Sequence, residues 1–363
     1  MKRLIRISLM ILLISISVSC EKKPIVQSVG TPYVRTYIIS ITQTTATFGG
    51  LVLTDGGDPI FSEGICWSTS KDPTIEQDSS IEIGPNSSFT GFISSLNPNT
   101  LYYFRTFAKN SAGTGYGNTV TSTTLLSEIK FNPNLTYGIV TDIENNKYKT
   151  INIGTQTWMA ENLRAAKYQN GDLIGTTSSP LVDITNEHNP KYEWAYDGNE
   201  SISILYGSLY TWDAVSDNRN VCPVGWHVPT HDEWTTLTDY LVNNGFGFGG
   251  SGNKIAKSMV TTSGWEIDET TEGSIGNNLS GNNSSGFSAI PTGFRGIGTE
   301  GFSYIGYGAY WWSSTEQSSD LAWRGCYMFF SSGSVYDGAS DKQGGLSVRC
   351  IQNGTATFIR TVG

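Results

Sequence analysis

Apolar and polar residues alternate along the first third of the chain, after an apolar N-terminal run. In "LYYFRTFA" (101–108) the period is two and both faces are partly apolar, which is typical of a strand in a two-sheet sandwich. The runs 44–53 and 61–70 are similar, and "DGGDP" (55–59) between them indicates a turn. We therefore expect an all-β sandwich over residues 36–125.

The region 126–363 has a different pattern. It begins with a strand-like segment, "TYGIVTDIENNKYKTINIG" (136–154), which carries a hairpin signal at 144–146. One amphipathic helix follows from Asp232 to about Val242, and its apolar residues share one helical face. The glycine-rich tract 245–286 predicts long loops. We expect an α+β domain with few helices.

The start of that helix lies in "CPVGWHVPTHDEW" (222–234), a stretch rich in the residue types of metal sites and acid–base catalysis. Thr230 and Glu233 have the spacing of a capping box, and Asp232 suits the positive end of a helix. His227 and His231 are separated by a proline, so they do not share a helical face, and no third ligand pattern is nearby. We interpret the stretch as architecture and expect no metal.

The amino-acid composition limits the kinds of partner that this protein is expected to bind. The chain has 363 residues, only 15% of them charged, and a net charge of -9. Phosphate binding needs clustered Lys and Arg, so nucleic acid is not an expected partner. The 41 glycines, 10 tryptophans and 18 tyrosines are typical of turn-rich β-structure.

The N-terminus predicts export. A basic start, "MKRLIR", precedes a short apolar run that ends in small residues before Cys20. This resembles a bacterial lipobox, although Ser17 stands where leucine is usual. We expect a signal peptide at 1–19, a lipid on Cys20, a tether at 20–35, and a location in the cell envelope, at the outer membrane or cell surface. Export also permits disulfides.

The sequence has no convincing motif for nucleotide binding, nucleophilic catalysis or calcium binding. "GFGFGG" (245–250) has the spacing of a dinucleotide-binding loop, but it follows a helix rather than a strand. No nucleophile elbow is present. Asp337 and Asp341 could be calcium ligands, yet we interpret "YDGASDKQG" (336–344) as a turn. We expect no catalytic residues, no cofactor and no enzymatic activity.

The first domain resembles fibronectin type III domains. Leu96, Pro98, Thr100 and Tyr102 have the spacing of their tyrosine corner, in which the phenol reaches back to a backbone carbonyl. The resemblance implies a sandwich that serves as a stalk. Cys66, alone in this domain, is expected to be a buried free thiol.

The second domain resembles the Fibrobacter succinogenes major paralogous domain, a family of bacterial surface and secreted proteins. The resemblance rests on "CPVGWHVPTHDEW" and on further blocks in the family's order: "IGTQTWMAENLR" (153–164), "YTWDA" (210–214), "GNKIAKS" (252–258), "GFSAIPTGFR" (286–295), "YWWSST" (310–315) and "SVRC" (347–350). It implies a C-type-lectin-like fold, which formylglycine-generating enzymes share. It also implies a disulfide between Cys222 and Cys350, with Cys326–Cys350 as the rival pairing. Cys326 departs from the family pattern.

These expectations define a non-catalytic lipoprotein whose lectin-like domain serves surface binding or adhesion on a sandwich stalk. Its partners would be the membrane, through the lipid, and a glycan or surface protein. The alternatives are a glycan-binding accessory protein of polysaccharide utilisation and an enzyme of the formylglycine-generating type, which would need a close cysteine pair. Trp311 and Trp312 point to opposite faces of a strand. Large aromatic residues are mostly buried, which favours burial of both tryptophans. If one of them is exposed instead, we expect the ligand platform at Tyr310, Trp311 and Trp312.

Overall fold

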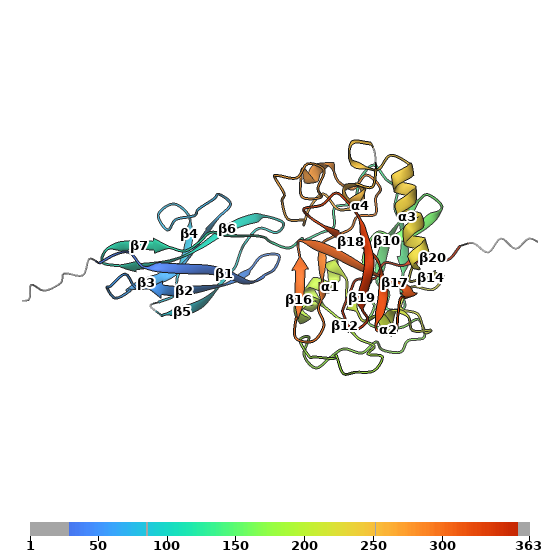
Figure 1. The fold of residues 1–363 in the computed structure, drawn as a ribbon, viewed down its shortest axis with the longest axis horizontal. Coiled ribbons are helices and arrows are strands. Elements are labelled where there is room, and N and C mark those ends of the chain that lie inside the picture. Colours follow the sequence, from blue (N-terminus) through green and yellow to red (C-terminus); the bar gives the residue numbers. More distant parts are fainter. Residues whose placement is uncertain (1–28, 85, 251, 355–363) are drawn as a thin grey trace, which may run out of the picture.

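The computed structural model describes residues 29–84, 86–250 and 252–354. Two domains follow one another along the long axis of the molecule (Figure 1). The predicted lipid site, Cys20, lies outside the described residues. Within the described ranges, no helix has the length and apolar character needed to span a membrane.

The N-terminal domain is a sandwich of two antiparallel sheets around an apolar core. One sheet has the order β1-β2-β5, with β1 at Tyr33–Ile41, β2 at Ala46–Thr54 and β5 at Ser88–Ile93. The other has the order β4-β3-β6-β7, with β8 also paired to β6. Its strands are β3 (Ser62–Ser68), β4 (Ser79–Glu82), β6 (Leu101–Asn110), β7 (Gly113–Tyr116) and β8 (Val120–Thr123).

Two details of this domain differ from the sequence expectation. The first strand begins at Tyr33, within the segment predicted to be a tether, because its alternating side chains Val34 and Thr36 are already buried. At the tyrosine corner, the Tyr102 hydroxyl accepts a hydrogen bond from the Asn97 amide at 3.1 Å, where we expected a carbonyl acceptor. Cys66 is a buried free thiol, as predicted.

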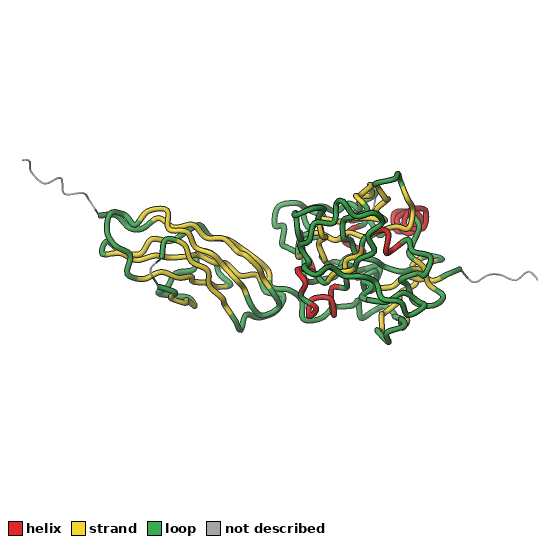
Figure 2. The backbone as a smooth tube through the Cα atoms, turned by 90° about the horizontal axis from the view of Figure 1, so that it is seen from below, coloured by secondary structure: helices red, strands yellow, loops and turns green. Residues whose placement is uncertain are grey.

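The C-terminal domain contains two five-stranded sheets and all of the described helices (Figure 2). The first sheet has the order β14-β20-β11-β10-β9, in which β20 pairs with β11 of the opening strands. Its strands are β9 (Gly138–Thr141), β10 (Lys147–Ile153), β11 (Gln156–Met159), β14 (Trp226–His227) and β20 (Ile351–Gln352). Asn145 has φ of 66° at the turn between β9 and β10, where the hairpin was predicted.

The second sheet has the order β16-β15-β17-β18-β19. Its strands are β15 (Thr292–Arg295), β16 (Phe302–Ile305), β17 (Gly308–Glu316), β18 (Leu321–Phe329) and β19 (Tyr336–Asp341). The sequence 336–341 is therefore a strand rather than the turn we predicted. Its pairing with β18 along the sheet edge decides the conformation, and only the Asp341 carboxylate serves a turn, by accepting from the Gln343 amide at 2.9 Å.

Short helices and a two-stranded hairpin complete the domain. The hairpin pairs β12 (Glu193–Trp194) with β13 (Leu209–Tyr210). The α-helices are α1 (Glu200–Tyr206), α2 (Trp212–Val215), α3 (His231–Asn243) and α4 (Ala256–Met259). Three short 3₁₀ turns are η1 (Tyr196–Gly198), η2 (Phe248–Gly250) and η3 (Leu279–Gly281). Helix α3, the longest among the described residues, covers the predicted segment.

Strand β17 lies between two apolar cores. Trp311 points into the core that includes α3, whereas Trp312 points into the other core. That second core contains the disulfide between Cys222 and Cys350, whose Cα atoms are 5.9 Å apart, so the predicted pairing is the one present. Cys326 is a free, buried thiol.

The two domains are joined by direct contacts. The Gly264 amide donates to Asn99 Oδ1 at 2.7 Å, and the Leu126 amide donates to the Tyr206 hydroxyl at 3.0 Å. The first bond joins a sandwich loop to the second domain, and the second fixes the start of that domain, Leu126, to helix α1. Together they hold the sandwich against the second domain.

Candidate functional site

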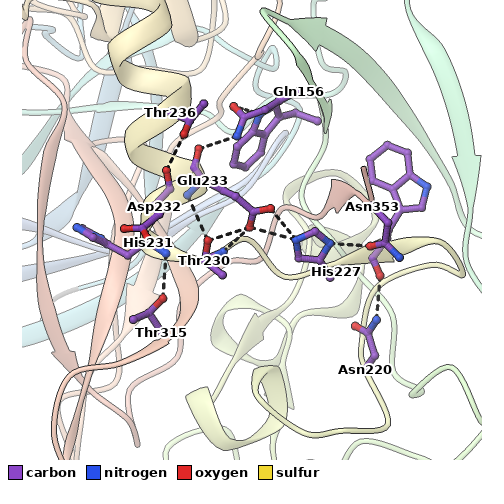
Figure 3. Close-up of polar contacts among 12 residues, drawn as sticks. Gln156, Asn220, His227, Thr230, His231, Asp232, Glu233, Thr236, Thr315 and Asn353 are labelled. Carbon is purple, nitrogen blue, oxygen red and sulfur yellow. Dashed lines mark hydrogen bonds and ion pairs between the residues drawn. The ribbon is translucent and has the colours of Figure 1, made fainter. Parts of the chain in front are cut away.

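The segment with the most reactive residue types forms the start of helix α3 (Figure 3). Thr230 Oγ1 accepts from the Glu233 amide at 3.2 Å, and Glu233 Oε2 accepts from the Thr230 amide at 2.8 Å. The predicted capping box is thus confirmed. Asp232 lies in the first turn, where its charge favours the positive end of the helix.

The two histidines of this segment have separate partners. His227 Nε2 lies 2.9 Å from Glu233 Oε1, and His227 Nδ1 lies 2.7 Å from Asn353 Oδ1. The His231 ring instead lies against Trp323, with ring centroids 4.8 Å apart. Across the part of the chain that the structure describes, no group of three or more His, Cys, Asp or Glu side chains could hold a metal.

Contact between His227 and Glu233 shifts the pKa of both side chains. The hydrogen bond that His227 donates to the Glu233 carboxylate raises the pKa of His227 above its ordinary value of 6.5. Burial opposes ionisation of Glu233, but hydrogen bonds from His227 and Thr230 outweigh it and lower the pKa of this carboxyl. The pair joins β14 to the start of α3, and Asn353 extends the contact to the residues after β20. We assign it a structural role.

Asn162 forms the centre of a second polar group, which is fully enclosed. Its Oδ1 accepts from Trp311 Nε1 and from Arg349 Nε, both at 2.9 Å. Its Nδ2 donates to the Tyr206 carbonyl and to Thr292 Oγ1, also at 2.9 Å. Four sequence blocks of the domain therefore meet at one amide side chain. We call Asn162, Trp311 and Arg349 the polar centre.

Arg349 has no carboxylate partner in the polar centre. Its guanidinium also donates to the carbonyls of Phe287 and, at 3.0 Å, Ser288. Burial lowers the pKa of Arg349 to about 9. A buried cation without hydrogen-bond acceptors is costly. The carbonyl and amide oxygens around Arg349 supply these acceptors and so allow its guanidinium to be buried.

The predicted ligand platform is wrong. Trp311 and Trp312 are both 0% exposed and Tyr310 is 4% exposed. The Trp311 indole N–H is bound to Asn162, and the Trp312 indole N–H donates to the Tyr210 carbonyl at 2.7 Å. Each face of β17 is covered by its own core, so the alternation of the strand exposes neither tryptophan.

Accessible aromatic rings occur around Tyr310 instead. Tyr310 and Tyr327 are stacked with centroids 5.8 Å apart, and Tyr327 and Tyr336 are stacked at 5.2 Å. On the other side, Phe294 lies 5.0 Å from Tyr310 and 5.6 Å from Tyr304. The row crosses the whole second sheet. We name it the aromatic face, comprising Phe294, Tyr304, Tyr310, Tyr327, Phe329 and Tyr336.

The ends of the aromatic face are the most accessible. Tyr304 is 48% exposed and Tyr336 is 41% exposed, while Phe294, Tyr327 and Phe329 are half-buried. The Arg324 guanidinium lies 4.3 Å from the centre of the Tyr327 ring. Sequence reasoning missed this surface because its residues come from five strands, and only the pairing of those strands brings the rings together.

The fold and the site define a mostly β protein of two domains with few helices and an aromatic surface on its second domain. The second domain matches a known family: residues 151–352 fit the model of the Fibrobacter succinogenes major domain. The chain therefore belongs to the Fibrobacter succinogenes major domain family, as its motifs predicted. No curated protein matches the chain.

Solved structures resemble about a quarter of the chain. They include the chicken CNTN1 FN1-FN3 domains, at 16% identity and a TM-score of 0.23, covering 26% of this chain and 32% of that one. A myokine structure is 17% identical, with a TM-score of 0.22, over 27% of this chain and 98% of that one. The sensor domain of the anti-sigma factor RsgI4 of Pseudobacteroides cellulosolvens is 20% identical, with a TM-score of 0.22, over 27% and 99%.

Proposed function

We propose that this protein is a non-catalytic binding or adhesion module of a bacterial cell envelope, and that it binds its ligand through the aromatic face. The observation that carries the proposal is the row of rings across the second sheet, whose ends, Tyr304 and Tyr336, are strongly exposed. Tyrosine, phenylalanine and arginine side chains are enriched at binding surfaces, where rigid rings bury much area at low entropic cost.

The proposal also covers how the aromatic face is attached to the cell and displayed. A lipid on Cys20 would anchor the chain to the outer membrane or cell surface, and the fibronectin-like sandwich would act as a stalk. The second domain would have the C-type-lectin-like fold. Mass spectrometry of the mature N-terminus tests the anchor, and an unmodified N-terminus within 21–35 would contradict it.

The chemistry of the remaining side chains supports a binding role over catalysis. An enzyme of the formylglycine-generating type would need a reactive cysteine pair, but Cys222 and Cys350 are joined in a disulfide. Burial raises the pKa of the Cys326 thiol far above its ordinary value, which disfavours the reactive thiolate. His227 and Glu233 are bound to each other.

A glycan-binding accessory protein is the second candidate, and the same rings favour it. Flat phenol rings stack on the apolar face of a sugar, and few charged groups lie in the aromatic face. Under this alternative the ligand would be a neutral polysaccharide, and chelators would not affect binding.

An array of glycans and surface proteins, probed with the purified protein, tests the proposal. Alanine at Tyr304, Tyr327 or Tyr336 is expected to weaken binding without unfolding the domain. Tyr33→Ala is the matched control, because Tyr33 is 61% exposed but lies in the sandwich. If the three variants bind as well as the control, the aromatic face is not the binding surface.

A further inference from the structure

A cavity of about 560 Å³ lies in the second domain, where the loop after helix α3 meets helix α4 and the segment 272–284. Its volume is in the range of small-molecule binding sites. None of its lining residues belongs to the aromatic face, so the two surfaces are separate. The residue types that line this cavity indicate what it can bind.

Three asparagine side chains line the cavity, and each amide is oriented by a hydrogen bond within the domain. Asn244 Nδ2 donates to a carbonyl of helix α3 at 2.7 Å, and Asn277 Nδ2 donates to the Asp268 carbonyl at 3.2 Å. Asn278 Oδ1 accepts from the Ser280 hydroxyl at 2.7 Å. The other polar atom of each amide has no partner among the described residues, so two oxygens and one NH₂ group remain for a ligand.

A buried lysine fixes the wall that contains Asn277 and Asn278. Lys257, on helix α4, is 8% exposed, and its ammonium donates to the carbonyls of Ser274 at 3.0 Å, of Asn277, and of Asn278 at 3.3 Å. These three acceptors use the three N–H groups of the ammonium, so Lys257 positions the wall and does not itself donate to a ligand. Because the wall is already ordered, a ligand loses little free energy to ordering it.

Two phenylalanine rings supply the apolar part of the lining. Phe248 is 39% exposed, and its ring packs against Gly273, where a Cβ atom would lie only 2.6 Å from the ring. Phe246 is half-buried. The lining also contains one cation, Lys257, and one anion, Glu272, so its formal charges balance. A neutral ligand with both apolar and hydroxyl-bearing surfaces matches this combination.

We infer that this cavity is a binding site for a neutral oligosaccharide. A sugar ring has an apolar face of C–H groups, which suits the exposed ring of Phe248. Its hydroxyl groups both donate and accept hydrogen bonds, so they can pair with the unused amide atoms of Asn244, Asn277 and Asn278. The inference goes beyond the proposed function, because the aromatic face takes no part in it.

Isothermal titration of the purified protein with cellohexaose, mannohexaose and xylohexaose tests the cavity. We expect at least one of them to bind, with an affinity that does not change with salt, because the ligand is neutral. Phe248→Ala should weaken this binding by about tenfold or more. Asn278→Gly should weaken it by about fivefold, because it removes the amide, whereas glycine tolerates the backbone φ of 54° at this position.

Matched controls and a folding measurement accompany these variants. Phe61→Ala removes a phenylalanine that is 64% exposed in the sandwich, and Asn134→Gly removes an exposed asparagine of the second domain outside the cavity. Both controls should bind the oligosaccharide as the unaltered protein does. Thermal unfolding followed by circular dichroism identifies any variant whose loss of binding comes from loss of the fold.

Three outcomes would overturn the inference: no binding of any of the three oligosaccharides, unchanged binding in folded Phe248→Ala and Asn278→Gly, or binding that Tyr304→Ala abolishes and Phe248→Ala does not. The last result would place the sugar on the aromatic face instead. Oligosaccharide binding that depends on Phe248 and Asn278, with no effect of any tyrosine variant on the array, would support the inference and contradict only the proposed function.

Discussion

The polar centre and the aromatic face are separated by a single strand, β17. On one side, Trp311 lies against Asn162 and Arg349, and all three are buried. On the other side, Tyr310 forms the base of a row of rings that reaches solvent at both ends. The polar centre is closed, whereas the rings that extend from Tyr310 are accessible at their ends and have the Arg324 guanidinium beside Tyr327. Polar and charged residues that resemble a functional site in the sequence can thus have a purely structural role.

The physical reason for this difference is desolvation. A guanidinium or an amide that is removed from water needs hydrogen-bond partners at fixed positions, so Arg349 and Asn162 hold several segments in one arrangement. Aromatic rings make no such demand and are stable half-exposed, where they remain available to a partner. Each prediction below compares the scaffold with the accessible surface, from the largest expected effect to the smallest.

Trp311→Ala should produce the largest loss of stability. Removing this indole leaves a cavity and deprives Asn162 of a donor, so we expect the free energy of unfolding to fall by about 3–5 kcal/mol. Tyr327→Ala, on the opposite face, should lower it less, because Tyr327 is only half-buried. Urea unfolding followed by tryptophan fluorescence measures both changes. Equal losses would mean that the aromatic face is also scaffold.

Loss of the disulfide should have the next largest effect. Replacing Cys222 and Cys350 by alanine is expected to cost about 2–5 kcal/mol, since the bridge closes a long loop and is buried in the core on the Tyr310 side. Cys326→Ala is the control for loss of a buried sulfur. Peptide mapping without reduction checks the pairing itself, and a Cys326–Cys350 peptide would contradict the structure.

The helix cap should contribute less. Thr230→Ala removes the acceptor for the Glu233 amide, so we expect a loss of about 1 kcal/mol in the same urea experiment. Thr236→Ala serves as the control, because its hydroxyl only donates to the Asp232 carbonyl within the helix. A change in any bound metal, with unchanged stability, would show that the segment is a metal site.

The smallest effect should depend on pH. The pKa of His227 is raised by Glu233, so its contribution to stability is complete below its ordinary value of 6.5 and is lost as pH rises through the folded-state pKa. The pKa of Glu233 is lowered, so its contribution is present above 4.5 and is lost as pH falls through its folded-state value. Between about pH 4.5 and 6.5, His227 is therefore protonated and Glu233 is ionised.

His227→Gln should therefore destabilise the protein at about pH 6 and much less at about pH 8.5, in line with loss of the imidazole charge. Urea midpoints at the two pH values give the comparison. A larger effect at the higher pH would mean that the neutral imidazole is the stabilising form.

Much of the fold and part of the site followed from the sequence. Local patterns predicted the start of α3, because a capping box needs only Thr230 and Glu233 three positions apart. The alternation of β6 predicted a sandwich strand, and the motif order predicted the family. The opposite directions of Trp311 and Trp312 also followed, since neighbouring side chains of a strand point to opposite faces.

Only the tertiary structure decided which parts of the protein pack against the two faces of β17. Whether Trp311 and Trp312 reach solvent depends on the layers that cover each side of β17, and no local pattern describes those layers. The strand at 336–341 was likewise hidden, because pairing with β18 overrides the turn preference of Asp337-Gly338. Tyr304 and Tyr336 lie 32 positions apart in the chain and at opposite edges of one sheet. Their common surface exists because strand order, which is set by long-range packing, places the rings between them in a row.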